Sequence, residues 1–556
     1  MVRLLQLIAL FLLLGMAGFA VFYLVGDHAS LTSWYLGLNS CFYNAENWQQ
    51  NFFTPQVKHA GNIWCTVALG SCLFLPALII RDWKRQTVPE TSYKIDARGA
   101  VWSALIILIG VLLWCYANML LKPAYDEVFS AVNISSLPLF QAWSYYMLPN
   151  NHILFNLVNN HSLTFGLDRV MIGRVLSLAA YIGTLLLVFN WLSTFLKNRA
   201  LALFMVVIIA IQLPTMGFAA QARGYELELF AGWLAFVSVY KYYILDQKNC
   251  LRWHAVAIWM GYAALPSFMY FHLTLLLFVL VWQMLKGFSL TFWKYTLVAG
   301  LCVFLFYLPA LCFSGLSSFA ENKYVTPAFS SFAQFWDDFP SRFTHYICWG
   351  LTFIFAEENP LNYVLFLLPC ALLAAKERKD KMLGVFYIIQ WIVFIAMVII
   401  MQRFPFKRNL IIHYSISLCL LLYTTYLFCR FLAARSRLQL LHSIIFAVLV
   451  LPVAIHLATA FTKNAPVMLY GPDNNELYAG NKKSVASLNV QGDIAFSEES
   501  FYWLYLYRQR FPQAKRCTSG NERYFVKRGF ESLPTRYSQY KLQQKYFEDY
   551  ELYIKP

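Results

Sequence analysis

The sequence predicts an all-α polytopic membrane protein with about thirteen transmembrane helices and a small C-terminal α/β domain outside the membrane. Three observations predict this class. The 556-residue chain is 59% hydrophobic and 13% charged, with a mean hydropathy of +0.52, which a water-exposed exterior could hardly sustain. Apolar runs of membrane-span length recur as far as Phe461. After Phe461 the composition changes abruptly to Tyr, Lys, Arg, Asn and Glu.

The apolar runs give the transmembrane helices in order. The first, Leu4 to Val25, is too long for the apolar core of a secretory signal and no Ala-x-Ala site follows it, so we interpret it as a retained span. The candidate spans lie at 3–25, 61–80, 99–121, 169–192, 200–218, 224–245, 254–267, 269–286, 295–313, 359–375, 383–401, 410–431 and 441–461.

The distribution of charge fixes the orientation of these spans. With the N-terminus inside, the inner segments hold 20 of the 44 Lys and Arg residues, whereas the short outer loops hold 9. This positive-inside bias places the end of the third span, and the loop after it, on the outer face. The net charge of +16 therefore mostly reports topology and attraction to anionic lipid headgroups rather than a nucleic-acid surface, and we expect no nucleic-acid partner.

Several outer segments are more complex than simple loops. Residues 122–168 show helical spacing of apolar residues, which predicts helices along the membrane surface, and 314–358 has the aromatic and polar mixture of an interfacial element. The spans around Leu265-Pro266 predict a broken helix pair that meets the outer side near 267–270. In the tail, ASLNV, IAF and RYFVKRG predict strands around a helix in SEESFYWLYLYRQRF.

The stretch KPAYDEV, residues 122–128, places two adjacent carboxylates where the third span leaves the bilayer. Adjacent residues cannot share one face of a helix, so Asp126 and Glu127 are expected to point in different directions. Charge so close to hydrocarbon is usually functional, and a carboxylate there can act as a general base. The alternative is a pair of solvated acids at the start of the next helix.

Other polar clusters lie at the same outer boundary. PNNHILFNLVNNHSL offers amides that suit sugar hydroxyls, and its two imidazoles, His152 and His161, are too far apart on a helix to favour a metal. Arg174 lies inside the next span and needs an anionic partner. QARGYELE places Arg223 and Tyr225 at a further span end. A polar interfacial face and snorkelling are the alternative interpretations.

The outer loop QRFPFKRNLIIH contradicts the positive-inside bias locally, because it holds Arg403, Lys407 and Arg408. Cations against that bias at a headgroup boundary suggest a bound anion, most simply the phosphate of a lipid. General attraction to anionic outer lipids is the alternative.

Taken together, these motifs resemble the GT-C membrane glycosyltransferases, in particular the branch with protein mannosyltransferases and the lipid A aminoarabinose transferase. The resemblance covers most of residues 99–430 and lies in the order of YDE, NNHILFNL, RVLS, RGYEL, the helices around Pro266–His272, and PFKRN. It divides the chain into two additional N-terminal helices with an outer loop (1–98), a GT-C-like catalytic core (99–461) and a periplasmic or lumenal α/β domain (462–556).

The resemblance implies transfer of a sugar from a polyprenyl-phosphate donor to a lipid, glycan or protein acceptor on the outer face, with inversion. It implies a bacterial inner membrane with a periplasmic active site, and it leaves a divalent metal open without naming any metal ligand. The implied residues are Asp126 as general base with Glu127 beside it, Arg223, Lys407 and Arg408 for the donor phosphate, and Tyr125, Asn151, His152, Arg174, Tyr225 and His272 for acceptor or sugar.

Two other functions remain open from the sequence. A transporter or flippase for a polar or lipid-linked solute would use Arg174 and the broken helices to line its path. A catalytically inactive relative would bind sugar or lipid without transfer. The crowding of polar residues at the outer boundary, rather than at mid-membrane, favours the enzyme.

Overall fold

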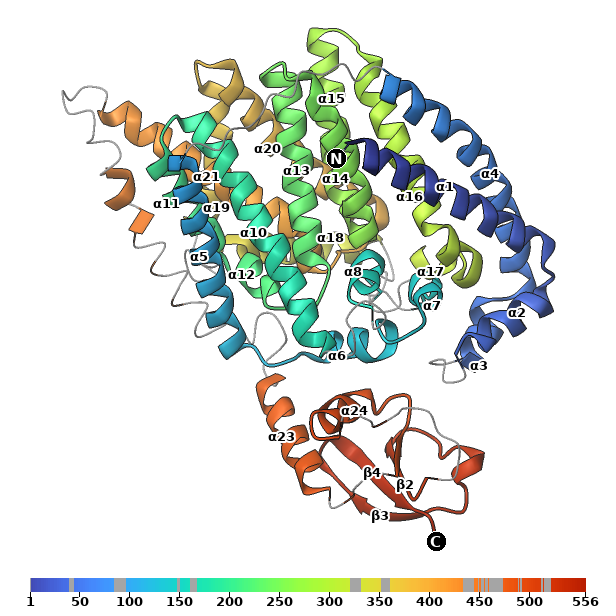
Figure 1. Cartoon of the computed structure of the whole chain (residues 1–556). Coiled ribbons are helices and arrows are strands. Elements are labelled where there is room, and N and C mark those ends of the chain that lie inside the picture. The colour runs from blue at the N-terminus through green and yellow to red at the C-terminus, as the bar shows by residue number, and fades with distance from the viewer. Residues whose placement is uncertain are drawn as a thin grey trace.

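Long helices form the body of the protein in the computed structural model, and a small α/β domain lies at one end of them (Figure 1). The structure describes residues 2–39, 45–84, 97–147, 151–160, 168–320, 332–351, 361–433, 445–448, 474–488, 493–511 and 522–556, with a few isolated positions between them. The predicted class is confirmed. The last predicted span, 441–461, lies largely outside the described residues.

Each of the other twelve predicted spans corresponds to helix in the described part of the chain. The helices are α1 (Val2–Val25), α4 (Pro55–Lys84), α5 (Ala97–Leu120), α10 (Arg169–Leu196), α11 (Arg199–Ala210) with α12 (Leu213–Ala219), α13 (Tyr225–Ile244), α14 (Leu251–Ala264), α15 (Met269–Lys286), α16 (Leu290–Ser314), α19 (Leu361–Leu367) with η5 (Leu368–Ala374), α20 (Arg378–Met401) and α21 (Ile411–Ala433). Seven described helices are long and apolar enough to cross a membrane, or eight with the bent α11–α12 pair.

One predicted span is bent in the structure, and the expected break between two other spans is present. The predicted span 200–218 was expected to be continuous but bends by 72° between α11 and α12, where Pro214 removes a backbone donor near the start of α12. The expected break after α14 is present: Leu265 is extended, η3 (Lys248–Cys250) precedes α14, and η4 (Pro266–Phe268) leads into α15.

The N-terminal helices α1 and α4 pack together, and α4 also packs against α16. The loop between them forms α2 (His28–Gly37), α3 (Ala45–Asn47) and η1 (Trp48–Phe52). Trp48 stacks on Tyr35 at 4.4 Å between ring centres and donates its indole N–H to the Phe313 carbonyl at 2.8 Å. These contacts fix the outer N-terminal loop to the end of α16.

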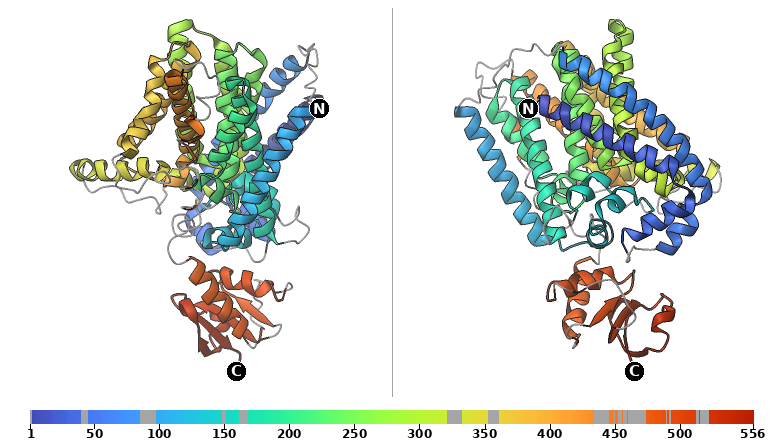
Figure 2. Two further views of the ribbon diagram at one scale, coloured as in Figure 1. Left: turned by 90° about the vertical axis from the view of Figure 1, so that its left-hand side faces the viewer. Right: turned by 45° about the vertical axis from the view of Figure 1, so that its right-hand side comes forward.

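The outer segments form short helices, as their sequence pattern predicts. Residues 122–168 contain α6 (Tyr125–Phe129), η2 (Ser130–Ile134), α7 (Leu139–Ser144) and α8 (Ile153–Val158). Residues 314–358 contain α17 (Ser317–Ala320) and α18 (Phe332–Leu351), and η6 (Lys407–Leu410) precedes α21. In the left view of Figure 2, α18 runs across the direction of the long helices, the orientation expected of a helix in the membrane interface.

The C-terminal domain has a four-stranded sheet in the order β1-β2-β4-β3, with α23 (Asn474–Ser487) and α24 (Phe501–Arg508). The strands are β1 (Ile494–Phe496), β2 (Tyr524–Arg528), β3 (Lys541–Lys545) and β4 (Tyr550–Ile554), with η7 (Thr535–Tyr537) and η8 (Phe547–Asp549) beside them. β1 and β2 pair in parallel, and β4 pairs antiparallel with β2 and β3. The expected strand ASLNV is wrong, because Ala486 and Ser487 end α23.

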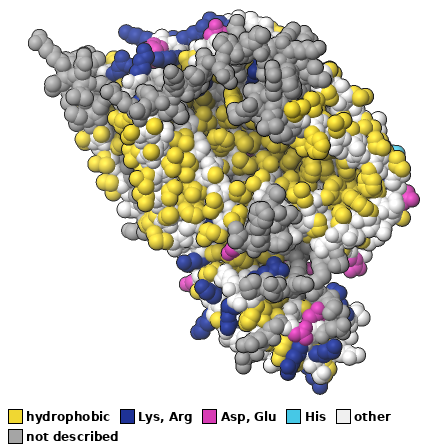
Figure 3. All heavy atoms as spheres, in the orientation of Figure 1, with side chains coloured by type: hydrophobic (Ala, Val, Ile, Leu, Met, Phe, Trp, Pro, Cys, Tyr) yellow, Lys and Arg dark blue, Asp and Glu magenta, His cyan; other side chains and the backbone are white. Residues whose placement is uncertain are grey.

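The surface has the distribution of side chains expected of a membrane protein. In Figure 3 the middle of the visible face is mostly hydrophobic, whereas Lys and Arg gather at the end away from the C-terminal domain and on that domain itself. Short helices α6, α7 and α8 lie at the end of the long helices that faces the C-terminal domain (Figure 1). The polar outer motifs therefore meet between these two parts of the chain.

Candidate active site

The two carboxylates of KPAYDEV both lie on α6 but contact different partners. Glu127 is fully buried, and its carboxylate accepts four hydrogen bonds. Oε1 accepts from Arg174 Nε at 3.1 Å and from the Ala222 backbone at 2.6 Å. Oε2 accepts from Arg174 Nη2 at 2.9 Å and from the Ala124 backbone at 2.8 Å. These bonds join α6, α10 and the segment between α12 and α13 at one point.

Arg174 completes this junction. Its Nη1 donates to the Asn118 side chain at 2.9 Å and to the Leu121 carbonyl at 3.0 Å, so the end of α5 is included. Only 5% of the Arg174 side chain is exposed. From the sequence we expected Glu127 to take part in catalysis and Arg174 to bind sugar. In the structure, the hydrogen-bonding groups of both side chains contact other protein groups instead. The geometry favours a structural role for each.

Asp126 has different partners and is 34% exposed. Its Oδ2 lies 2.8 Å from Arg223 Nη1 and 3.6 Å from Arg408 Nη1. The Tyr225 ring lies close to both cations, 5.3 Å from the Arg223 guanidinium carbon and 5.7 Å from that of Arg408. Residues from three outer motifs, YDE, RGYEL and PFKRN, therefore meet at one carboxylate.

The loop that carries Arg408 is supported by α18. Phe404 packs against Phe339 and Tyr346 at 5.7 Å and 5.2 Å between ring centres, and the Tyr346 hydroxyl donates to the Pro405 carbonyl. Lys407 is half-buried in the same turn as Arg408. The interfacial helix thus holds two of the three cations expected to bind phosphate.

His152 contacts this site from the start of α8. The Gly224 backbone N–H donates to Nδ1 at 2.8 Å, which assigns the ring proton of neutral His152 to Nε2. Nε2 lies 2.9 Å from Arg223 Nη2, so two donors face each other and that contact is not a hydrogen bond in this tautomer. Burial, followed by the charges of Arg223 and Arg408, holds the pKa of His152 well below 6.5. His152 is therefore neutral near pH 7.

The remaining predicted residues separate into different places. Asn151 is buried and its amide is used inside the loop: Nδ2 donates to the Ala142 carbonyl at 3.2 Å, and Oδ1 accepts from Asn156 at 2.9 Å. His272 lies one turn into α15, with Nδ1 3.1 Å from the Tyr262 hydroxyl. Tyr125 is half-exposed and packs against Phe501 of the C-terminal domain. His161 lies outside the described residues.

Several residues that build the site were not singled out from the sequence. Asn118 and Ala222 complete the Glu127–Arg174 junction, and Gly173 allows α10 to approach Ala222, since a β-carbon at Gly173 would lie 2.6 Å from that of Ala222. Glu228 is fully buried and accepts a hydrogen bond from Ser267 at 3.2 Å. Its partner is 39 residues away, so no local sequence pattern connects the two.

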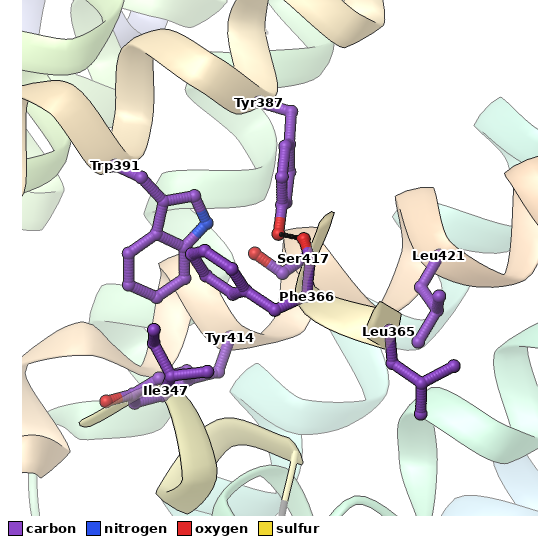
Figure 4. A pocket seen from close by; sticks show the side chains of 8 residues that line it. All are labelled: Ile347, Leu365, Phe366, Tyr387, Trp391, Tyr414, Ser417 and Leu421. Atoms are coloured by element: carbon purple, nitrogen blue, oxygen red, sulfur yellow. Dashed lines mark hydrogen bonds between the residues drawn. The ribbon is translucent and has the colours of Figure 1, made fainter. Parts of the chain in front are cut away.

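A pocket elsewhere in the membrane body contains none of these residues (Figure 4). It lies beside α20 and α21, and the Tyr387 hydroxyl at its wall donates to the Phe366 carbonyl. The lining is mostly apolar: Ile347, Leu365, Phe366, Tyr387, Trp391, Tyr414, Ser417 and Leu421. The described residues also contain no group of three His, Cys, Asp or Glu side chains able to hold a metal ion.

The Glu127–Arg174 pair predicts a large stability effect. Glu127→Gln and Arg174→Met each leave a buried partner uncompensated, so each should lower the free energy of unfolding by about 3–5 kcal/mol. The double variant should lose less than the sum of the two, as measured by denaturation of the purified protein in detergent. The matched control is the exposed pair Glu377 and Lys379, 2.7 Å apart, whose substitution should cost at most about 1 kcal/mol. Additive losses at Glu127 and Arg174 would contradict the junction.

His152 predicts a pH effect on stability. Unfolded His152 titrates near 6.5 and the folded residue well below, so the unfolded state binds more protons as the pH falls below 6.5. The free energy of unfolding should fall there, by up to about 1.4 kcal/mol per pH unit. His152→Asn keeps an acceptor for Gly224 and should weaken this dependence, whereas His59→Asn on the exposed side of α4 should not. Equal pH dependence in wild type and His152→Asn would contradict the assignment.

Comparison with known proteins adds information on the fold. No family model matches the chain, and no curated protein matches it. Among solved structures, ArnT from Cupriavidus metallidurans bound to undecaprenyl phosphate is similar, with a TM-score of 0.50 at 13% identity over 81% of this chain and 97% of that one. The apo state of the same protein gives 0.49 at 12% identity, over 82% and 98%. The first likeness confirms, at the level of fold, the resemblance inferred from the sequence: this chain has a GT-C-like membrane fold.

Proposed function

We propose that this protein is a membrane glycosyltransferase that moves a sugar from a polyprenyl-phosphate donor to a lipid, glycan or protein acceptor. One observation carries the proposal: Asp126 is partly exposed at the end of a span and faces the guanidinium groups of Arg223 and Arg408. Adjacent Glu127 is fixed in a buried junction. A reactive carboxylate beside an anion-binding pair is what transfer from a phosphate-linked donor requires.

The donor phosphate is proposed to bind Arg223, Arg408 and Lys407. Guanidinium groups make strong charge-assisted hydrogen bonds to phosphate, and these would strengthen as charge develops on the leaving group. The Nε2–H of His152 lies beside Arg223 Nη2, and two donors so close together favour an acceptor that accepts a hydrogen bond from both. ArnT, which has a similar fold, binds undecaprenyl phosphate, and this supports a polyprenyl-linked donor.

In the proposed reaction Asp126 accepts the proton of the acceptor hydroxyl or amine. The acceptor atom forms a bond to the anomeric carbon while the bond from that carbon to the phosphate oxygen breaks, with inversion at the carbon. The electron pair of the broken bond leaves on polyprenyl phosphate, where Arg223 and Arg408 stabilise it. The products are the glycosylated acceptor and polyprenyl phosphate.

In the proposed reaction, donor binding releases Asp126 for proton transfer. Without the donor, Arg223 and Arg408 hold the Asp126 carboxylate in ion pairs. A phosphate bound to both guanidinium groups would compete with Asp126 for them and weaken these ion pairs. Asp126 would then become available to the acceptor only when the donor is present, so that proton abstraction follows donor binding.

The outer face is proposed from the charge distribution. The helix α6, which carries Asp126, lies at the end of the long helices next to the C-terminal domain (Figure 1), whereas Lys and Arg of the membrane body gather at the opposite end of the visible face (Figure 3). In a bacterial inner membrane this is the periplasmic face. The apolar surface between the two ends is proposed to contact membrane lipids.

Asp126→Asn tests the proposed base. It should lower kcat by about 10²–10⁴-fold, the usual contribution of a general base, in transfer from radiolabelled polyprenyl-phosphate sugars to extracted lipid and glycan acceptors. Asp338→Asn is the matched control, because Asp338 is also exposed beside an arginine, 3.4 Å from Arg342, but lies on α18. Equal transfer by wild type and Asp126→Asn would remove Asp126 from the mechanism.

Binding of undecaprenyl phosphate separates the base from the phosphate site. Asp126→Asn should bind it at least as tightly as wild type, because a competing anion is removed, whereas Arg408→Ala should bind it about tenfold more weakly and Arg342→Ala should not change. Absence of transfer with every donor, together with counterflow of a solute, would favour the transporter instead.

A further inference from the structure

The C-terminal domain contacts the turn that carries Asp126. Phe501, the first residue of α24, packs edge-on against Tyr125 at 4.7 Å and Phe129 at 5.2 Å between ring centres. These two residues are four apart, so they share one side of α6. Asp126 lies between them in sequence and points toward Arg223 instead. One side of α6 is therefore held by the C-terminal domain and another by the Glu127 junction.

A single peptide group links the two contacts. The Tyr502 hydroxyl donates to the Pro123 carbonyl at 2.8 Å, and the Ala124 N–H of the same peptide donates to Glu127 Oε2 at 2.8 Å. This peptide immediately precedes α6, two residues before Asp126. Its orientation is therefore fixed from one side by the C-terminal domain and from the other by the membrane body.

Further contacts from the same domain hold the neighbouring helix ends. The side-chain amides of Asn474 and Asn475 donate to the carbonyls of Lys122 and Leu120 at 3.4 Å each, where α5 ends. Tyr505 donates to Asp168 at 3.4 Å, at the start of α10. Carbonyls at a helix end lack intrahelical partners, so the Asn475 amide provides a donor for Leu120, the last residue of α5.

The length of α6 makes these contacts decisive. The helical stretch that begins at Tyr125 continues from α6 through η2 and ends at Ile134, and helices shorter than about 12 residues are only marginally stable by themselves, so its direction is set by what it touches. A shift of about 1 Å in a catalytic group can cost 10²-fold in rate. The direction of the Asp126 side chain therefore depends on contacts with α24 as well as on Glu127.

We propose that Tyr502 is a positioning residue: through the Pro123–Ala124 peptide it sets the direction of Asp126, which makes the C-terminal domain part of the active site. The Tyr502 hydroxyl bonds the Pro123 carbonyl and not a proposed phosphate ligand, so it acts on the rate of transfer and not on phosphate binding. The effect on rate rests on the proposed function. The effect on the α6 turn does not.

Tyr502→Phe tests the proposal in the full-length protein, because it removes the hydroxyl and keeps the ring. Hydrogen–deuterium exchange of the amides of residues 124–129 should become roughly three- to tenfold faster, the factor expected from loss of one hydrogen bond. The matched control is Tyr507→Phe on the same helix, whose hydroxyl donates to Val490 within the domain at 3.1 Å. It should leave exchange at 124–129 unchanged.

Turnover and binding provide the second readout. With a donor that wild type uses, Tyr502→Phe should lower kcat about tenfold while the Kd for undecaprenyl phosphate stays within about twofold of wild type. Unchanged exchange at 124–129, or faster exchange with an unchanged kcat, would overturn the positioning role. Faster exchange in a protein that shows no transfer with any donor would support the contact and reject the proposed glycosyltransferase.

Discussion

The outer end of the membrane body depends on the hydrogen bonds of the buried Glu127 carboxylate. Its four hydrogen bonds connect the start of α6, the Arg174 guanidinium of α10 and the Ala222 backbone before α13. Arg174 extends the junction to the end of α5. A buried charge pair of this kind tolerates no rearrangement that leaves either charge alone, so the segments around it keep one relative position.

The junction explains why two carboxylates adjoin in the sequence. Glu127 is used to hold α6, and this leaves Asp126 on a different side of the helix, facing Arg223 and Arg408. Arg223 follows Ala222 directly, so the same backbone segment both bonds Glu127 and presents a cation to Asp126. Structural and proposed chemical roles are therefore divided between neighbouring residues, and neither residue can replace the other.

The helices of the membrane body could be predicted from the sequence because the length and hydropathy of a span are local properties. The bend between α11 and α12 and strands β3 and β4 were missed. β3 is an exposed polar strand, KLQQK, without the apolar alternation that marks a strand in sequence. The motifs of the site could be found one by one, but their contacts join residues far apart: Glu127 bonds Arg174 across 47 positions, and Tyr502 bonds Pro123 across 379. No local pattern distinguishes a glutamate in a junction from one open to a ligand.

An experimental structure of the full-length protein with undecaprenyl phosphate would test the proposed site most directly. We expect phosphate oxygens within hydrogen-bonding distance of Arg223 and Arg408, with Asp126 farther from both guanidiniums than the present 2.8 Å and 3.6 Å and with the bonds of Glu127 unchanged. A phosphate bound elsewhere, with Asp126 still paired to both arginines, would contradict this expectation.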